Sequence, residues 1–239
     1  MNVVVIGASG GIGQALTRQL AQSPAVRRIT TCSRSRPAIL EPKSRWCPLD
    51  LTDETTIADA AQLVGSAGGA LNLVLVATGI LHEGESLRPE RTWRTLDGST
   101  LEQVYRVNAV GPTLVAKHFL PLLAYDRKSV FAALSARVGS ISDNHLGGWH
   151  AYRASKAALN MLLRTLAIEL ARRNPSAICV GLHPGTVETP LSAPFRSGVP
   201  DGRLFTPDVA AAHLLDVLDR LSPNDSGGVF AWDGSPVPP

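Results

Sequence analysis

Several features that would assign a class of protein at once are scarce in this sequence of 239 residues. The longest apolar run, around Leu71 to Leu81, is far shorter than the roughly 18 residues of a membrane-spanning helix. The cysteines Cys32, Cys47 and Cys179 show no paired spacing, so we expect neither a disulfide framework nor a zinc site. The chain begins without a basic stretch ahead of an apolar one, which predicts no secretory signal. A cytoplasmic protein without a metal is therefore expected.

Charge of one sign is also scarce, since charged residues make up 18% of the chain and the net charge is +3. Together with 44% hydrophobic residues, this balance excludes intrinsic disorder. A basic run lies between positions 27 and 45. A phosphate site for a cofactor together with a solvated face explains this run more simply than nucleic-acid binding does, so no nucleic acid and no membrane are expected as partners. The run contains Arg27, Arg28, Arg34, Arg36, Lys43 and Arg45.

Short β-branched runs alternate with longer helical patterns along the chain. Strands that are apolar throughout and alternate with helices predict an α/β fold, in which a parallel sheet has right-handed crossovers and helices on both faces. We expect strands at Asn2–Ile6, Arg28–Cys32, Arg45–Leu49, Leu71–Val76, Ser129–Leu134, Ala177–Leu182 and Val229–Trp232.

The expected helices have recognisable starts and breaks. Asp53 and Thr206 are suitable N-caps, and Gly111-Pro112 is expected to bend a long helix. No repeat or linker divides the chain, so one domain over 1–239 is expected, with a substrate-loop insertion at about 189–206 that is rich in Pro, Gly and Ser. The helices are expected at Gln14–Gln22, Thr56–Val64, Thr100–Leu123, Ala151–Arg173 and Pro207–Leu221.

The first strand runs into a glycine-rich turn, and the turn runs into a helix. Gly7, Gly11 and Gly13, with Ser9 and Ile12 between them, have the spacing Gly-x-x-x-Gly-x-Gly. Glycine allows the tight turn and the close approach of a pyrophosphate, which the N–H groups at the helix start then bind. No Gly-Lys-Ser/Thr follows, which disfavours a P-loop. The alternative is an ordinary glycine-rich turn between a strand and a helix.

The end of the second strand indicates which dinucleotide is bound. An acidic residue there binds the ribose of NAD, whereas arginine accommodates the 2′-phosphate of NADP. The sequence has no acid there, and Arg34 follows Ser33. The planar fork of arginine suits a phosphate, so we expect Arg34 and Ser33 to bind NADP(H), with NAD(H) less favoured. The alternative is a solvated basic loop.

Tyr152 and Lys156 are four residues apart on an expected helix, so they share one face. A phenol with a pKa near 10 is a poor acid or base at neutral pH. A nearby ammonium stabilises the phenolate and lowers that pKa. Such a tyrosine can protonate a developing alkoxide or deprotonate an alcohol.

The order of these motifs resembles that of the short-chain dehydrogenase/reductase family, over nearly the whole chain. The glycines of the first turn are followed by Asp50-Leu51, Asn108, the Tyr-x-x-x-Lys pair and Pro184-Gly185. The Gly-Ser-Ile-Ser-Asp-Asn run ahead of Tyr-Arg-Ala-Ser-Lys is similar to the branch that holds sniffer-type carbonyl reductases and C-factor-like proteins. The resemblance implies a Rossmann-type doubly wound sheet of about seven strands.

The resemblance also implies a role for each matching residue. Tyr152 is the expected proton donor or acceptor, and Lys156 is expected to lower its pKa and to hold the nicotinamide ribose. Asn108 is expected to fix a helix irregularity and a proton-relay water, and Asp50 to hold the adenine amino group. The remaining residues expected at the cofactor are Leu51, Ala77, Thr78, Gly79, Pro184, Gly185, Val187 and Thr189.

The catalytic serine of the family has no direct counterpart. Counting back from Gly139, the serine position holds Ala136, and Ser135 is one residue early. Neighbouring residues of a strand point to opposite faces, so Ser135 faces away from the substrate unless the strand end is bulged. Ser135 is kept as the candidate hydroxyl, with Ser140 and Ser142 as nearby substitutes.

Two further departures from the family pattern lie near the site. Val76-Ala77-Thr78-Gly79 stands where the family often has Asn-Asn-Ala-Gly, which removes asparagine bonds that brace the sheet. The stretch from Gly139 to Tyr152 is about three residues longer than in the common arrangement, and we expect the extra residues to form a loop at the rim. His145 and His150 are interpreted as rim residues rather than catalytic bases, and no metal spacing links them.

These observations predict an NADP(H)-dependent oxidoreductase that transfers a hydride between the nicotinamide and a small apolar carbonyl or alcohol. Apolar residues near the expected site favour such a substrate. The alternative is an NADP(H)-binding regulatory or cell-signalling protein of the C-factor type with vestigial turnover, which Ala136 favours. A third hypothesis, NAD(H)-dependent alcohol oxidation, conflicts with Arg34. The apolar helix 151–173 and the family resemblance predict a homodimer or homotetramer. The apolar residues expected over the nicotinamide are Trp149, Leu191, Phe195, Leu204 and Phe205.

Overall fold

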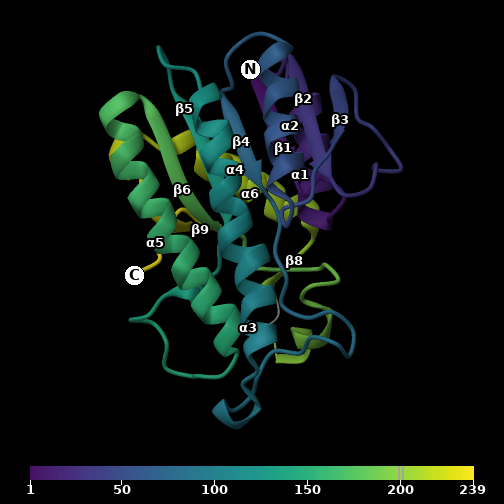
Figure 1. The fold of residues 1–239 in the computed structure, drawn as a ribbon, viewed down its shortest axis with the longest axis vertical. Coiled ribbons are helices and arrows are strands. Elements are labelled where there is room, and N and C mark those ends of the chain that lie inside the picture. The colour runs from purple at the N-terminus through teal and green to yellow at the C-terminus, as the bar shows by residue number, and fades with distance from the viewer. Residues whose placement is uncertain (199, 201) are drawn as a thin grey trace.

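The computed structural model describes residues 1–198, 200 and 202–239, and a parallel sheet forms its centre (Figure 1). In the described part the sheet has seven strands in the order β3-β2-β1-β4-β5-β6-β9. The strand order reverses between β1 and β4, which is where open α/β sheets bind ligands at their carboxyl ends. The strands are β1 (Asn2–Ile6), β2 (Arg28–Ser33), β3 (Ser44–Pro48), β4 (Leu73–Val76), β5 (Ser129–Leu134), β6 (Ala177–His183) and β9 (Val229–Ala231).

Helices cover both faces of the sheet, as expected for a doubly wound fold. The helices α1 and α6 pack on one face, and α2, α4 and α5 pack on the other. In Figure 1 the second group lies in front of the sheet and α6 lies behind it. The helices are α1 (Gly11–Gln22), α2 (Glu54–Ser66), α3 (Gly98–Tyr105), α4 (Gly111–Phe119), α5 (His150–Arg173) and α6 (Pro207–Arg220).

The strands are apolar throughout because both of their faces are buried. In β1, Val3 and Val5 pack toward α1 and α6, whereas Val4 and Ile6 pack toward the opposite helices. The expected N-caps are confirmed. Asp53 accepts a hydrogen bond from the N–H of Thr55 at the start of α2, and Thr206 caps α6.

The local structure differs from the expectations at two places. The helix expected over Thr100–Leu123 is divided into α3, a π turn at Arg106–Val110 and α4. The irregularity therefore lies at Asn108, where the family resemblance implies one, and not at the Gly111-Pro112 pair. Pro112 lies in the first turn of α4, directly after the π turn, so its missing N–H falls where the helical hydrogen-bond pattern changes. The sequence also did not predict the small parallel ladder of β7 (Thr186–Val187) and β8 (Leu204–Phe205), because strands of two residues carry no periodic pattern.

Within the described residues, no helix is long and apolar enough to cross a membrane, and no group of three metal-ligating side chains is found.

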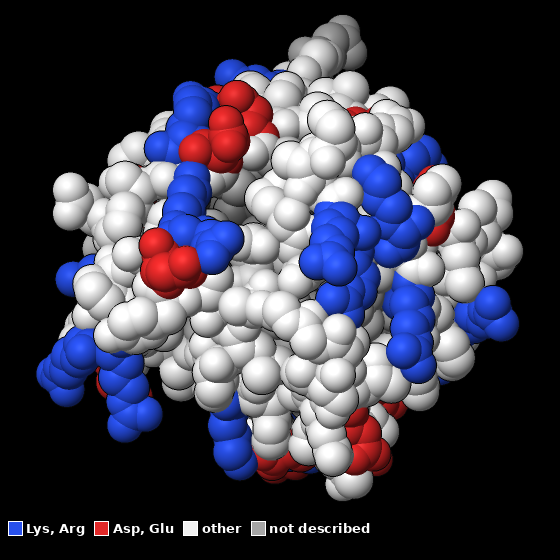
Figure 2. Space-filling view, turned by 90° about the horizontal axis from the view of Figure 1, so that it is seen from above, with Lys and Arg blue, Asp and Glu red and all other residues white. Residues whose placement is uncertain are grey.

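Figure 2 shows the end of the molecule where the N-terminus lies, with Lys and Arg in several small groups and Asp and Glu beside some of them. Part of the basic run braces main chain. Arg28 donates to the carbonyl oxygens of Ala67 and Gly68, and Lys43 donates to that of Ser23.

Candidate active site

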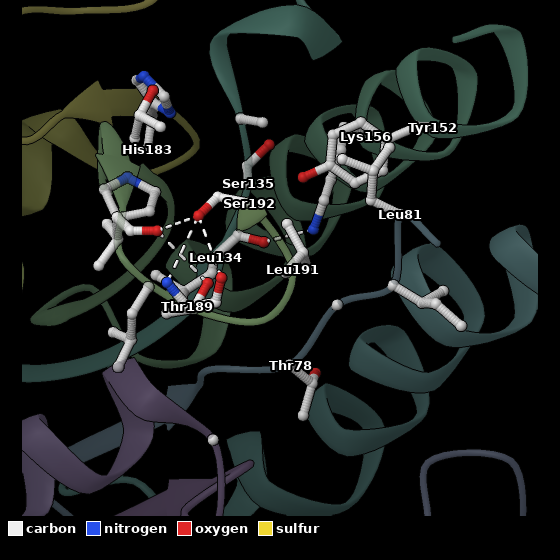
Figure 3. A pocket seen from close by; sticks show the side chains of 18 of the residues that line it. Thr78, Leu81, Leu134, Ser135, Tyr152, Lys156, His183, Thr189, Leu191 and Ser192 are labelled. Atoms are coloured by element: carbon white, nitrogen blue, oxygen red, sulfur yellow. Dashed lines mark hydrogen bonds between the residues drawn. The ribbon is translucent and has the colours of Figure 1, made fainter. Parts of the chain in front are cut away.

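A cavity of about 610 Å³ lies at the carboxyl ends of β1, β4, β5 and β6. Its walls are the segments that follow these strands, at 10–12, 77–82, 134–138 and 183–187, and residues from 189 to 195 complete them. Figure 3 shows side chains from these segments directed toward a common space. Much of the segment expected as a substrate loop therefore adjoins the cavity, whereas its positions 199 and 201 lie outside the described residues.

The glycine turn packs as tightly as its sequence predicts. Gly7 has φ +84°, and a Cβ there would lie 2.7 Å from the carbonyl oxygen of Ala77. A Cβ on Gly13 would lie 2.2 Å from the carbonyl oxygen of Gly7, so only glycine lets α1 approach the turn. Gly11 and Ile12 line the cavity, while Ser9 is exposed. The first N–H groups of α1 therefore lie where an anion is stabilised by the helix dipole.

Arg34 lines the same cavity from the end of β2. The Ser33 hydroxyl beside it is buried, donates to the carbonyl oxygen of Ser35 at 2.7 Å and accepts from the Trp46 indole at 3.2 Å. Ser33 therefore braces the turn that presents Arg34. None of the described residues that line the cavity is Asp or Glu, so no carboxylate opposes an anion there.

Asp50 and Leu51 are both outside the set of described residues that line the cavity. Asp50 accepts hydrogen bonds from the N–H and the hydroxyl of Thr52, which lower the pKa of its carboxyl, and nearby Arg34 lowers it further. Leu51 is buried in the core beside Gly111. The structure thus shows structural roles for both and does not bring them to the cavity wall.

Asn108 holds the chain that leaves β4. It lies fully buried in the π turn, where its Oδ1 accepts from the N–H of Ile80 and its Nδ2 donates to the Ile80 carbonyl oxygen, both at 2.8 Å. Nδ2 also donates to the Ser155 hydroxyl on α5. A Cβ on Gly79 would lie 3.5 Å from both Asn108 Oδ1 and Lys156 Nζ. Ala77, Thr78 and Gly79 all line the cavity, so this wall is made of small residues.

Tyr152 and Lys156 lie in the cavity on successive turns of α5. Lys156 Nζ donates to the carbonyl oxygen of Leu134 at 2.8 Å (Figure 3) and lies 5.7 Å from the centroid of the Tyr152 ring. Burial raises the pKa of Tyr152 to about 12 and lowers the pKa of Lys156 to about 8. Burial is the cause of the shift at Tyr152, and the lowering of its pKa by Lys156 stays a prediction.

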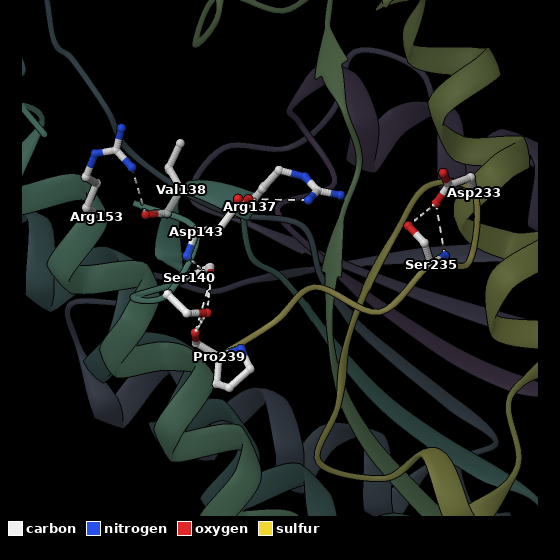
Figure 4. A network of polar contacts seen from close by, with 9 residues as sticks. Arg137, Val138, Ser140, Asp143, Arg153, Asp233, Ser235 and Pro239 are labelled. Atoms are coloured by element: carbon white, nitrogen blue, oxygen red, sulfur yellow. Dashed lines mark hydrogen bonds and ion pairs between the residues drawn. The ribbon is translucent and has the colours of Figure 1, made fainter. Parts of the chain in front are cut away.

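The hydroxyls near the end of β5 are engaged elsewhere. The Ser135 hydroxyl donates to Asn160 Oδ1 at 2.6 Å, although Ser135 also contributes to the cavity wall beside Ala136. Ser140 and Ser142 both donate to the main-chain oxygen of Pro239; Figure 4 shows this bond for Ser140. The structure therefore brings none of these three hydroxyls onto Tyr152 by a hydrogen bond within the described residues.

The residues after β6 form the opposite wall. Pro184, Gly185, Val187 and Thr189 all line the cavity. Gly185 has φ +76°, and a Cβ there would lie 2.7 Å from the ring of Phe205. Glycine thus lets the β7–β8 ladder pack against this turn.

Aromatic rings close the other end of the cavity. Trp149, Leu191 and Phe195 line the cavity. The Trp149 and Phe195 rings pack edge to face, with their centroids 4.9 Å apart. Leu204 and Phe205, which we expected over the nicotinamide, lie in β8 instead. The Phe205 ring packs on the Trp232 ring, with their centroids 4.7 Å apart. His145 and His150 also lie outside the described residues that line the cavity, and His145 is exposed.

Three polar residues at the cavity were missed in the sequence. His82 Nε2 lies 3.0 Å from the carbonyl oxygen of Pro190. His183 lines the cavity, and burial, together with the charge of Arg137, lowers its pKa to about 4, so its imidazole is neutral at pH 7. Arg137 pairs with Asp143 at 3.4 Å (Figure 4). His183 ends β6, and His82 and Arg137 follow the ends of β4 and β5. This position at the carboxyl ends of the strands is the signal that identifies them.

A sheet of this strand order with a glycine turn at its switch point defines a Rossmann-type α/β protein. Residues 1–199 match the family model described as short chain dehydrogenase, and the chain belongs to this family of oxidoreductases.

Comparisons with individual proteins agree with the family. The chain is 37% identical to C-signal of Myxococcus xanthus over 143 residues, which cover 60% of this chain and 81% of that protein. The NADPH-bound carbonyl reductase from chicken fatty liver superposes with a TM-score of 0.85 at 30% identity, with 99% of this chain and 98% of that one covered. Carbonyl reductase Sniffer of D. melanogaster has the same fold, with a TM-score of 0.85 at 22% identity and the same coverage.

Proposed function

We propose that this chain is an NADPH-dependent carbonyl reductase that acts on small, largely apolar carbonyl compounds. The observation that carries the proposal is one continuous cavity, with the glycine turn and Arg34 in its lining together with Tyr152 and Lys156. A dinucleotide is long enough to connect such groups. The similarity to an NADPH-bound carbonyl reductase supports the same assignment.

The residues present fit NADPH. Gly11 and Gly79 leave room at the wall, since a Cβ on Gly11 would lie 3.0 Å from Thr189 Cγ2. The N–H groups at the start of α1 suit the pyrophosphate, and Arg34 suits the 2′-phosphate. We propose that Thr78, Gly79, Pro184, Val187 and Thr189 line the nicotinamide half, and that Asp50 and Leu51 support the adenine pocket from outside the cavity wall.

NADPH, held at the start of α1 and by Arg34, would supply the hydride that the carbonyl carbon of the substrate needs. Tyr152 donates its phenolic proton to the carbonyl oxygen and regains one from solvent. A pKa near 12 keeps this phenol protonated at neutral pH, which is the form that reduction requires. Lys156 stabilises the phenolate that forms, and Asn108 fixes the chain at Ile80 beside them. Trp149 and Phe195 exclude water from the reacting atoms.

The test is NADPH oxidation by the purified protein with ketones, diketones, aldehydes and quinones, and the Tyr152→Phe variant as the blank. We expect turnover with the unmodified protein and none with the variant, because the phenol is the proton donor. NADPH affinity should stay within about twofold, because the variant removes a single hydroxyl. Equal turnover by both proteins would remove Tyr152 from the mechanism.

A second candidate function is an NADP(H)-binding signalling protein with vestigial turnover. Two observations favour it, namely the similarity to C-signal and the alanine at position 136. The same assay separates the candidates. NADPH binding in a fluorescence titration without turnover on any substrate would favour the signalling protein.

We also propose that the protein assembles as a homodimer or homotetramer through α5. Met161 and Ile168 on this helix are 67% and 47% exposed, which leaves apolar surface for a second copy. Light scattering coupled to gel filtration measures the mass directly, and a monomer at micromolar concentration would contradict the proposal. The expectation of a cytoplasmic location rests on the sequence alone.

A further inference from the structure

The helix that carries Tyr152 begins without a cap of its own. Gly147, Gly148 and Trp149 have φ values of 63°, 66° and 51°, so the chain turns sharply into α5 through three left-handed residues. Trp149 is the N-cap residue, and its side chain makes no capping bond because an indole has no acceptor. The first N–H groups of a helix need acceptors from elsewhere.

Glu90, which is distant in sequence, supplies these acceptors. Its carbonyl oxygen accepts from the N–H of Trp149 at 2.6 Å, and its carboxylate Oε2 accepts from the N–H of Ala151 at 3.2 Å. Glu90 thus accepts hydrogen bonds from the residues just before and just after His150, the first residue of α5. The positive end of the helix dipole also favours a carboxylate at this position.

The environment of Glu90 is unusual for a carboxylate. The residue is 5% exposed, its Oε1 is buried without a hydrogen-bond partner, and it has no ion-pair partner among the described residues. Burying a carboxylate with a free oxygen is costly, and an exposed Ser or Asp at the N-cap would satisfy the helix with less penalty. A remote cap differs from a local one in that it joins two segments of the chain.

The two segments meet at the substrate end of the cavity. The Trp149 ring packs edge to face on the rings of Tyr152 and Phe195, with centroid distances of 6.2 Å and 4.9 Å. A tryptophan with a φ of 51° is strained and persists only where its surroundings hold it. The hydrogen bond from Trp149 to Glu90 is such a restraint, and Tyr152 follows directly after the N–H that the carboxylate binds.

We infer that Glu90 is a positioning residue, which holds Trp149 as the aromatic wall of the substrate cavity and sets the place of Tyr152 beside it. This inference rests on the proposed function for its kinetic consequence, but not for its structural one. Removal of the carboxylate keeps the main-chain bond from Trp149 to the Glu90 carbonyl oxygen but takes away the acceptor of the Ala151 N–H and the packing that holds the Glu90 segment in place. The start of α5 loosens, whereas the glycine turn and Arg34 are untouched. The loss therefore falls on carbonyl turnover and not on NADPH affinity.

The experiment compares three variants of Glu90, namely Glu90→Ala, Glu90→Asp and Glu90→Gln, with Glu85→Gln. Glu85 is an exposed carboxylate in the same segment between β4 and α3. Amide hydrogen exchange of residues 147–153 is measured with kcat/KM, NADPH affinity and melting temperature. We expect Glu90→Ala to exchange faster and to lose roughly tenfold to a hundredfold in kcat/KM, with NADPH affinity within about twofold. Glu90→Gln, whose amide oxygen still accepts, should stay within about threefold, and Glu85→Gln should match the unmodified protein.

If Glu90→Ala does not fold, Glu90→Asp decides, since its shorter side chain withdraws the carboxylate from Ala151. Exchange and kcat/KM equal to those of the unmodified protein would overturn the inference, as would NADPH affinity that falls in step with kcat/KM. If the unmodified protein turns over no carbonyl compound, the proposed function fails. In that case hydrogen exchange alone decides whether Glu90 holds the start of α5.

Discussion

The hydroxyl of Ser135 donates a hydrogen bond of 2.6 Å to Oδ1 of Asn160. Asn160 lies on α5 one turn beyond Lys156, so this bond ties the end of β5 to the helix that carries the Tyr–Lys pair. The N–H of Ser135 also bonds to the carbonyl oxygen of Leu182 in β6. Ser135 thus fastens three elements together, while Ala136 beside it presents only a methyl group to the cavity.

The first prediction concerns this pair of residues. Ser135→Ala should lower kcat by less than about threefold and stability by roughly 1 kcal/mol, because the lost bond is structural. Ala136→Ser should raise kcat by about tenfold, since one oxyanion donor contributes on the order of a hundredfold in other enzymes. Steady-state kinetics with the best carbonyl substrate, and urea unfolding of each variant, test both. A hundredfold loss in Ser135→Ala would restore Ser135 as the catalytic serine.

The second prediction concerns pH and Lys156, whose pKa burial lowers from 10.5 to about 8. Between these values the unfolded chain keeps a proton that the native state has lost, so stability rises with pH across this window. Over the whole window the gain is about 3 kcal/mol. Urea unfolding of the cofactor-free protein from pH 7 to 10 should show this rise, and Lys156→Met should lack it. Parallel curves for the two proteins would contradict the lowered pKa of Lys156.

Tyr152 makes folding stability fall with pH, above the window in which Lys156 makes it rise. The reason is that burial raises the pKa of Tyr152 from 10.0 to about 12. The native state keeps a proton that the unfolded chain loses above pH 10, so this contribution to stability disappears as the pH rises toward 12. Tyr152→Phe should therefore lose less stability than the unmodified protein between pH 10 and 11. Urea unfolding at these two pH values measures the difference, and an equal loss in both proteins would contradict it.

The third prediction concerns cofactor choice. Arg34→Ala should weaken NADPH binding by roughly tenfold to a hundredfold, because a charge-assisted bond to a phosphate is lost, and should leave NADH binding unchanged. Arg36→Ala is the matched control, since Arg36 is exposed and lies outside the described lining of the cavity. Fluorescence titrations with both cofactors test this, and equal losses for the two would make Arg34 a structural residue.

The fourth prediction concerns the glycine turn. Gly13→Ala should destabilise the protein by about 1–3 kcal/mol, because its Cβ would collide with the main chain at Gly7. Gly10→Ala is the control, since a Cβ there meets its nearest atom at an ordinary 3.4 Å. Thermal unfolding should separate the two variants by several degrees. Equal melting temperatures would show that α1 shifts to make room.

The sequence predicts those parts of the fold that depend on neighbouring residues. The apolar run of β1 and the caps Asp53 and Thr206 were found because burial on both faces and capping leave short-range patterns. The family resemblance placed a helix irregularity at Asn108, and the π turn lies there. The local sequence pattern alone pointed to Gly111-Pro112 instead, because the π turn depends on a bond between Asn108 and Ile80, 28 residues earlier. Glu90 carried no signal at all, because its partners lie about sixty residues further along the chain.

By itself, the sequence determined the class of fold, the glycine turn, the basic residue after β2 and the pairing of Tyr152 with Lys156 on one helix face. Each of these follows from local periodicity or from the conformational freedom of one residue. Only the tertiary structure decided that the Ser135 hydroxyl bonds to Asn160, that Lys156 bonds to Leu134 and that Phe205 packs on Trp232. Such contacts join segments that are distant in the chain, and their geometry is set only when the sheet and helices pack together.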